Sequence, residues 1–137
     1  MRVEIVTPEA VLFAGPADEF VARSSAGEYT VMDHHADFVT DAVPGMVTVR
    51  VGSVSTEYCN HGGFVQVGKD PATGETLVTL LASVAECVAD VDAERARKAL
   101  ADAEAALADP NCDEITRADA LAARARAELR LRVTLAH

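Results

Sequence analysis

Aromatic residues and cysteines are scarce in this 137-residue chain. It has no tryptophan, two tyrosines and four phenylalanines, which leaves few of the flat aromatic surfaces that ligand-binding sites commonly use. Its three cysteines, Cys59, Cys87 and Cys112, lie far apart and form no Cys-x-x-Cys pair. Their number and spacing indicate neither a disulfide framework nor a zinc knuckle, and they fit a reducing compartment.

Long apolar runs and basic residues are also lacking. No segment approaches the roughly 18 consecutive apolar residues that span a bilayer, and the first residues lack the apolar run of a signal peptide. We therefore expect a soluble protein with no direct membrane insertion. With 12 Lys and Arg against 22 Asp and Glu, the net charge of −10 repels phosphate backbones, so nucleic acid and anionic lipid surfaces are poor candidate partners.

The chain divides into two parts of different composition. Residues 1–91 are rich in Val, Thr and Gly and carry 4 basic against 13 acidic side chains. Residues 92–137 contain no glycine, are dominated by Ala and carry 8 basic against 9 acidic side chains. The first part predicts β-strands and the second predicts helices, with domains at 1–88 and 89–137.

Short β-branched or aromatic runs separated by Gly and Pro turns predict strands in the first part. In one of them Val47, Val49 and Val51 alternate with other side chains, as in an antiparallel strand with one buried face. Because long crossover helices are absent, these strands predict a mainly β fold, either a sandwich of two antiparallel sheets or a flattened barrel. The predicted strands are 2–6, 10–14, 19–23, 46–51, 54–60, 64–67 and 76–81.

From Asp92 the apolar period becomes helical. Asp92 is the predicted N-cap of a helix that ends before Pro110, and Asp113 or Thr116 is predicted to cap a second helix. The short connection makes the two helices antiparallel neighbours. Because alanine dominates their apolar stripes, the hairpin should bury little area per turn and act as a detachable arm. The predicted stripes are Ala96, Ala99, Leu100, Ala103 and Leu107, then Ala118, Leu121, Ala122, Ala125, Leu129 and Val133.

Four residues that can ligate a metal lie within five positions: Asp33, His34, His35 and Asp37. Adjacent histidines point to opposite sides of a strand, so only one pair could converge unless the segment is a loop. A solvated turn between two strands is the favoured interpretation. A small metalloenzyme that uses His34, His35 and Asp37 is the alternative, and it predicts bound metal in the purified protein.

Cys59 and His61 are two residues apart on a predicted strand, so they share one face and could form a thiolate–imidazole pair. No acidic residue stands at a spacing that would orient the imidazole. The sequence therefore favours a partly buried cysteine beside a turn histidine. The following Gly62-Gly63 precedes a strand rather than a helix, so it predicts a tight turn and not a phosphate-binding loop.

Arginines concentrate in the helical part of the chain. They could form a solvated face paired with neighbouring acidic residues. They could equally converge on a polyanion, either a nucleotide phosphate or a carboxylate-rich partner. The sequence leaves both interpretations open. The residues are Arg95, Arg97, Arg117, Arg124, Arg126, Arg130 and Arg132.

Five segments follow one another in a characteristic order: 3–9, Gly27-Glu28, 43–45, 62–67 and 91–96. With this order, and with a β part before a helical hairpin, the chain resembles the epsilon subunit of bacterial F-type ATP synthases. The resemblance implies an antiparallel ten-stranded flattened β-sandwich followed by a C-terminal antiparallel two-helix hairpin. It also implies a non-catalytic subunit of the rotating central stalk, which couples proton-driven rotation to ATP synthesis.

The same resemblance implies partners and contacts. The sandwich would bind the gamma subunit and the membrane c-subunit ring at the cytoplasmic face of the bacterial membrane. The hairpin, when extended, would meet the alpha and beta subunits of the catalytic head and inhibit ATP hydrolysis. Glu28 and His35 are the implied contacts to the c ring, although the usual Pro-Gly-His-Ala-Pro stretch is replaced here by residues 33–37.

Some members of this family bind ATP on the folded hairpin through an Ile/Leu-Asp-x-x-Arg-Ala motif, an upstream glutamate and further arginines. Asp102 and Glu128 stand where such members carry arginines, and anions there repel a triphosphate. We therefore expect ATP binding to be weak or absent and no cofactor to be required. The residues that match the motif are Glu86, Val91, Asp92, Arg95, Ala96 and Arg124.

One further interpretation stands beside this resemblance. The chain could be a free-standing β-sandwich module that binds a small ligand and carries a helical appendage. That interpretation predicts an autonomous monomer, whereas the resemblance predicts a stable complex with a gamma subunit.

Overall fold

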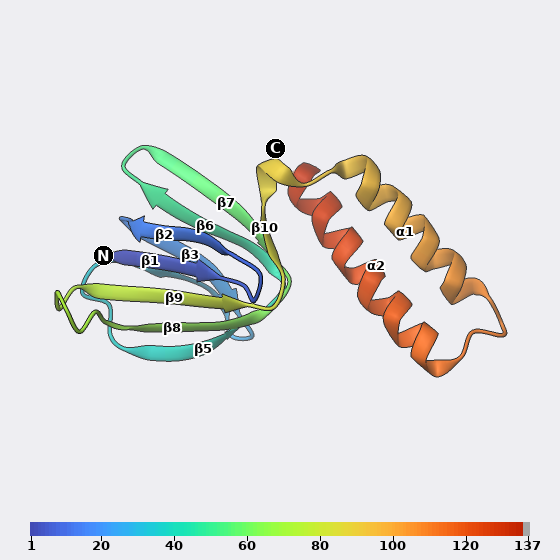
Figure 1. Ribbon diagram of the computed structural model, residues 1–137, viewed down its shortest axis with the longest axis horizontal. Helices are drawn as coiled ribbons and strands as arrows, with labels where there is room; N and C mark the ends of the chain where they lie inside the picture. Colours follow the sequence, from blue (N-terminus) through green and yellow to red (C-terminus); the bar gives the residue numbers. More distant parts are fainter. Residues whose placement is uncertain (136–137) are drawn as a thin grey trace. The chain divides into compact units, whose positions relative to one another are not determined.

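The computed structural model describes residues 1–135 and divides the chain into two compact units, with the division between Ala89 and Asp90 (Figure 1). The boundary predicted from the sequence, between residues 88 and 89, lies one residue from this division. The first unit is made of strands and the second of two helices. Neither helix, nor any other in residues 1–135, combines the length and the apolarity that crossing a bilayer requires.

In the first unit, the described residues form ten strands in two five-stranded sheets, with strand orders β2-β1-β9-β8-β5 and β10-β7-β6-β3-β4. The predicted ten-stranded sandwich is thereby confirmed. The strands are β1 Arg2–Val6, β2 Val11–Pro16, β3 Glu19–Ser24, β4 Gly27–Val31, β5 Phe38–Ala42, β6 Gly45–Val51, β7 Val54–Asn60, β8 Gly63–Lys69, β9 Thr76–Ala82 and β10 Ala85–Cys87.

Alternate side chains of the strands form the core between the sheets. In β6, Val47 and Val49 are buried while Thr48 and Arg50 are partly exposed, as the alternation predicted. Val51, at the end of the same strand, is exposed, because it lies at the β6–β7 turn. Phe20 of β3 is the largest fully buried side chain of the core.

One strand pair departs from the antiparallel pattern expected from the sequence. β1 pairs with β9 in parallel, from Arg2 opposite Leu77 to Val6 opposite Leu81. Parallel neighbours need a long connection, and here that connection is most of the sandwich rather than a crossover helix. The other strand pairs of the described residues are antiparallel.

Local sequence patterns did not predict three of the strands. β4 and β5 flank the loop that contains His34 and His35, and short polar residues interrupt their apolar pattern. β10 has only three residues, none of them β-branched, and it forms by pairing with the end of β7. For these strands, pairing with a neighbour outweighs the weak local preference.

The second unit is an antiparallel helical hairpin of α1, Ala93–Ala108, and α2, Glu114–Leu135, which pack against each other after the short 3-10 helix η1, Val88–Asp90 (Figure 1). The predicted caps are confirmed. The Asp92 carboxylate accepts a hydrogen bond from the Arg95 N–H at 3.1 Å, and the Asp113 carboxylate accepts one from the Thr116 N–H at 2.7 Å.

The predicted apolar stripe of α2 is wrong for most of its members. Leu129 and Val133 are buried, but Leu121 is 43% exposed, and the alanines that are buried are Ala120 and Ala127. Alanines occur on every side of this helix. The faces therefore differ too little in hydrophobicity for the periodicity to identify the buried one.

Candidate partner-binding surfaces

The loop between β4 and β5 does not gather the four predicted metal ligands. The Asp33 carboxylate lies 2.7 Å from the Met1 α-amino group, and this hydrogen bond lowers the pKa of Asp33. His34 has a positive φ of 66°, and its backbone N–H donates to the Thr76 hydroxyl at 3.0 Å. His35 instead lies beside Phe38, with ring centroids 5.1 Å apart. Among the described residues, these side chains do not converge on a common point.

The two residues implied as contacts to the c ring lie toward opposite ends of the sandwich. Glu28 is exposed on the edge strand β4, one residue after the β3–β4 turn and opposite Arg23. That turn is tied to Asp41, which accepts hydrogen bonds from Ser25, and these bonds lower the pKa of Asp41. His35 follows the other end of β4. A partner that touched both residues would therefore have to extend along the strand.

An apolar row crosses the outer face of one sheet. It consists of four residues on neighbouring strands, each opposite the next in the strand register: Val11 of β2, Val6 of β1, Leu81 of β9 and Phe64 of β8. Phe64 and Val11 are each 62% exposed and Leu81 is 53% exposed. Contiguous exposed apolar side chains of this kind are typical of surfaces that bind another protein. Sequence analysis missed this row, because strand register, and not spacing along the chain, brings its members together.

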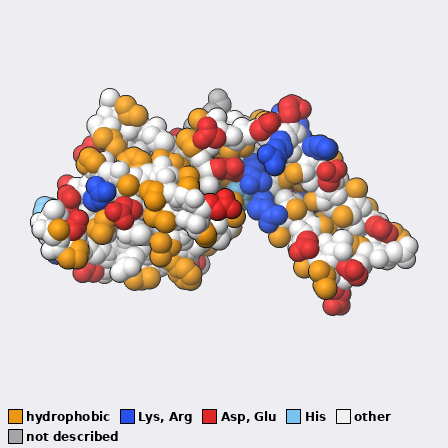
Figure 2. All heavy atoms as spheres, viewed as in Figure 1, with side chains coloured by type: hydrophobic (Ala, Val, Ile, Leu, Met, Phe, Trp, Pro, Cys, Tyr) orange, Lys and Arg blue, Asp and Glu red, His pale blue; other side chains and the backbone are white. Residues whose placement is uncertain are grey.

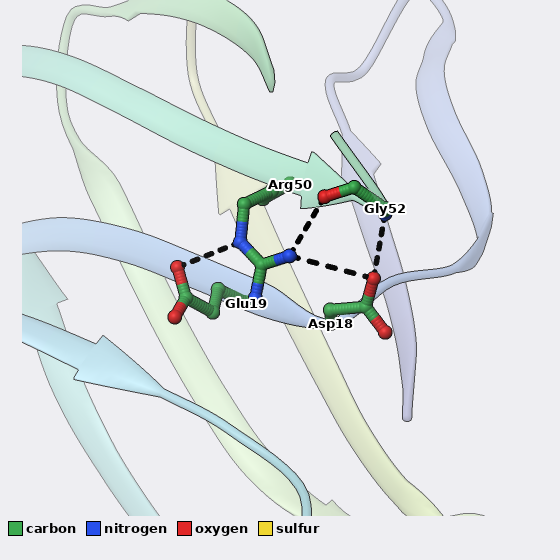
Figure 3. Close-up of polar contacts among 4 residues, drawn as sticks. All are labelled: Asp18, Glu19, Arg50 and Gly52. Carbon is green, nitrogen blue, oxygen red and sulfur yellow. Dashed lines mark hydrogen bonds and ion pairs between the residues drawn. The ribbon is translucent and has the colours of Figure 1, made fainter. Parts of the chain in front are cut away.

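A charged cluster on the other sheet has a structural role (Figure 3). Arg50 of β6 donates from Nε to Glu19 of β3 at 3.1 Å and from Nη1 to the Gly52 carbonyl at 2.8 Å. Asp18 accepts a hydrogen bond from the Gly52 N–H at 2.6 Å. The hydrogen bond to Glu19 raises the pKa of Arg50. The cluster fixes the β6–β7 turn against the start of β3.

The six residues that match the nucleotide motif are divided between the two units. Glu86 lies on β10 of the sandwich, and the other five precede or belong to the helices. Asp92 caps α1, and Ala96 is buried. The Arg124 guanidinium lies 3.8 Å from the carboxylate of Glu128, one of the two acidic residues expected to disfavour a triphosphate. The identity of these residues as a nucleotide site stays a prediction.

Basic side chains gather over the helices of the second unit, whereas few occur on the visible face of the sandwich (Figure 2). Some of these side chains have acidic neighbours on the same helix, as the solvated-face interpretation expects: Arg97 pairs with Glu94, and Arg124 with Glu128. Such exposed pairs contribute little stability. They agree with the solvated-face interpretation, and convergence of the arginines on a polyanion stays a prediction.

The Cys59–His61 pair has an acidic neighbour that the sequence did not reveal. The Cys59 Sγ lies 3.6 Å from the His61 Nε2, and the same nitrogen lies 3.4 Å from the Glu86 Oε1. Spacing along the sequence indicated no acidic partner for this imidazole, and the fold supplies one in Glu86. Glu86 is 25 residues from His61 in sequence, and the pairing of β10 with β7 places it directly opposite Cys59.

Comparison with known proteins identifies the family. The domain family described as the ATP synthase Delta/Epsilon chain beta-sandwich domain matches residues 1–88. The ATP synthase epsilon chain of Geobacter metallireducens is 32% identical over 133 residues, which cover 97% of this chain and 92% of the relative. That of Maricaulis maris is 37% identical over 103 residues, which cover 75% and 73% of the two chains.

Solved structures agree with these sequence relatives. One similar chain comes from a structure of the Euglena gracilis mitochondrial ATP synthase that contains OSCP, F1 and the c-ring. It is 25% identical and superimposes with a TM-score of 0.76. The match covers 98% of this chain and 80% of that one. A chain of the Tetrahymena thermophila mitochondrial ATP synthase central stalk and c-ring, 16% identical with a TM-score of 0.62, has the same fold. The chain therefore belongs to the family of ATP synthase epsilon chains.

Proposed function

We propose that this protein is a non-catalytic central-stalk subunit of a proton-translocating F-type ATP synthase, in which it joins the gamma subunit to the c-subunit ring. Its membership of the epsilon chain family supports the assignment to this complex. The observation that carries the docking role is the apolar row of Val11, Val6, Leu81 and Phe64, because an exposed apolar surface on a rigid sheet favours a stable protein contact.

The gamma subunit is the proposed occupant of the apolar row. The row is flanked by polar and charged positions such as Asp41, which is opposite Phe64 in the β5–β8 pair. An apolar centre with a polar rim is the usual arrangement of a specific interface. Phe64 is the expected anchor, since large aromatic side chains contribute most to such contacts.

The test is co-expression of the full chain with the gamma subunit of the same organism, followed by size-exclusion chromatography. The wild-type chain should elute in a stoichiometric complex. Phe64→Glu should weaken the complex at least about tenfold, because it buries a charge in the interface. Val54→Glu is the matched control, since Val54 is 63% exposed but lies on the other sheet. Two separate peaks for the wild-type chain would instead favour a free-standing binding module.

A second contact is proposed between the acidic sandwich and basic loops of the c ring. The net charge of −9 that follows from 4 basic and 13 acidic residues in positions 1–91 favours such an encounter electrostatically. Glu28 is the exposed acidic residue proposed for it, with His35 as the second, separate contact. Glu28→Gln should reduce binding of the gamma complex to c rings and its dependence on salt, whereas Glu75→Gln, on the β8–β9 turn, should leave both unchanged. An unchanged Glu28→Gln variant would remove this contact.

The helical hairpin is proposed to inhibit ATP hydrolysis by contacting the alpha and beta subunits when it extends. Most buried residues of its helices are alanines, so little free energy separates a closed hairpin from an extended one. Contacts with a partner can then select either form. Truncation after Asp90 should raise the ATPase activity of the assembled complex, and an unchanged activity would contradict the inhibitory role.

Nucleotide binding by the isolated chain is proposed to be weak or absent. Glu128 competes for the Arg124 guanidinium and adds negative charge where a phosphate would lie. A Glu128→Arg variant should bind ATP at least about tenfold more tightly than the wild type in a calorimetric titration. Tight binding by the unaltered chain would contradict this proposal.

In the assembled enzyme the protein would act peripherally, at the cytoplasmic face of the bacterial membrane.

A further inference from the structure

Three side chains of different chemistry converge beside the last strand of the sandwich. Ligand atoms of Cys59, His61 and Glu86, one from each residue, all lie within 4.8 Å of one another. They offer one sulfur, one imidazole nitrogen and one carboxylate oxygen, the three donor types that zinc accepts in proteins. No other group of at least three such donors occurs in residues 1–135.

The fold holds these donors on regular elements. Cys59 is on β7, and Glu86 is directly opposite it on β10, so their side chains share one face of the sheet. His61 follows β7 by one residue, and its backbone N–H donates to the Val84 carbonyl at 2.9 Å. The Asn60 side chain accepts a hydrogen bond from the Gly62 N–H at 3.1 Å, and this bond fixes the turn that contains His61.

The burial of the three residues also fits a bound metal. Cys59 is fully buried, and the His61 side chain is only 5% exposed. The Glu86 side chain is 29% exposed, which leaves one side of the cluster open to solvent and to an entering ion. A buried sulfur and nitrogen with a partly exposed carboxylate can bind an ion whose remaining ligand is water.

The same geometry argues against a nucleophilic triad. In a triad the two ring nitrogens have different partners, one the nucleophile and the other the orienting carboxylate. Here the His61 Nε2 faces both the Cys59 sulfur and the Glu86 oxygen. A single nitrogen cannot pass a proton from one partner to the other through the ring, whereas three donors around one point are what a metal ion requires.

The distances agree with tetrahedral coordination. Bond lengths of about 2.3 Å for zinc–sulfur and about 2.1 Å for zinc–nitrogen and zinc–oxygen place sulfur and nitrogen ligands about 3.6 Å apart, and nitrogen and oxygen ligands about 3.4 Å apart. The Cys59 Sγ to His61 Nε2 distance is 3.6 Å, and the His61 Nε2 to Glu86 Oε1 distance is 3.4 Å. Two of the three distances between ligand atoms therefore already have the values that tetrahedral zinc coordination needs.

We propose that Cys59, His61 and Glu86 form a divalent metal site of zinc-like preference, with water in the fourth position. The metal would link β7 to β10, a strand of only three residues. It would thereby fasten the last strand of the sandwich, directly before η1 and the helical unit. This site is independent of the proposed contacts with gamma and the c ring, so its test does not depend on them.

The test titrates Co²⁺, a spectroscopic substitute for Zn²⁺, into the metal-free full chain under reducing conditions. One equivalent should bind, with a thiolate-to-cobalt charge-transfer band and the intense visible bands of a tetrahedral site. Zn²⁺ should displace the Co²⁺ and raise the melting temperature. Absence of the charge-transfer band in the wild-type chain would overturn the proposal.

Variants identify the ligands. Cys59→Ser should lose the charge-transfer band, and Glu86→Gln should retain it but bind the ion at least about tenfold more weakly. Glu86 is partly exposed, so its variant stays informative if replacement of the buried Cys59 prevents folding. Cys112→Ser is the control and should bind like the wild type, because Cys112 lies in the helical unit. A band lost in Cys112→Ser but kept in Cys59→Ser, or an unchanged affinity in Glu86→Gln, would show that the metal binds elsewhere.

Discussion

The sandwich and the helical hairpin differ in what fills their interiors. Within residues 1–135, the largest fully buried side chains, such as Phe20, Ile5 and Leu80, all belong to the sandwich. The buried residues of α1 and α2 are four alanines, one leucine and one valine. Because the hydrophobic contribution scales with the apolar area buried, the sandwich is a stable platform and the hairpin a marginal one. This contrast supports the proposal that the sandwich docks on the complex and the hairpin changes state.

The largest effect is expected from truncating the sandwich core. Phe20→Ala should lower the free energy of unfolding of the sandwich by about 3–5 kcal/mol, since it leaves a large cavity. Phe64→Ala, on the exposed apolar row, should change it by only about 0.5 kcal/mol. Urea denaturation of both variants measures the difference. A similar small loss for Phe20→Ala would mean that the sandwich core is no better packed than the hairpin.

The next effect concerns a close approach of two backbones in the sandwich. Gly63 has a φ of +153°, and a Cβ atom there would overlap the carbonyl oxygen of Leu81 on the neighbouring strand. Gly63→Ala should therefore cost about 3 kcal/mol of stability. Gly74 also has a positive φ, +73°, but nothing lies within 4 Å of an added Cβ, so Gly74→Ala should cost about 1 kcal/mol. Equal losses in the two variants would contradict the steric explanation.

A smaller effect is expected at the start of α1, where the Asp92 side chain caps the helix. Asp92→Ala removes the carboxylate that accepts the Arg95 N–H, and it should destabilise α1 by about 1 kcal/mol. Circular dichroism during thermal unfolding would record the loss of helix, and Asp92→Ser should restore most of it. If the sandwich strands were lost together with the helix, the two units would not unfold independently.

The smallest expected effect is a difference between the two units in their stability at alkaline pH. Both tyrosines, Tyr29 and Tyr58, lie in the sandwich, and burial raises the pKa of each; for Tyr29, burial and then the nearby Asp41 raise the pKa to about 12. A raised pKa means that the stabilising contribution is complete below the ordinary value of 10.0 and is lost as the pH rises toward 12. Alkaline pH should thus destabilise the sandwich selectively. Tyrosinate absorbance that titrates near pH 10 in the folded protein would contradict this.

Local signals in the sequence determined most element positions. Strands 2–6 and 54–60 were predicted with the bounds that the structure has, because turn residues delimit them sharply. Both helices were predicted, with Asp92 as the cap of the first and Asp113 or Thr116 as the cap of the second. The structure selects Asp113, which accepts a hydrogen bond from the backbone N–H three residues later, as Asp92 does in α1. The order of the five segments 3–9, 27–28, 43–45, 62–67 and 91–96 was enough to indicate the family that the comparisons then confirmed.

Pairing over long distances in sequence decided the rest. The parallel β1–β9 pair, the short β10 and the apolar row depend on strand register, which local periodicity does not specify. Because alanines are spread around α2, the sequence did not identify its buried face. Packing against α1 buries Ala120 and Ala127. The approach of Glu86 to His61 has the same origin, because two residues 25 positions apart become neighbours only after β10 has paired with β7. The sequence alone therefore determined the elements, and the tertiary structure determined which side chains could act together.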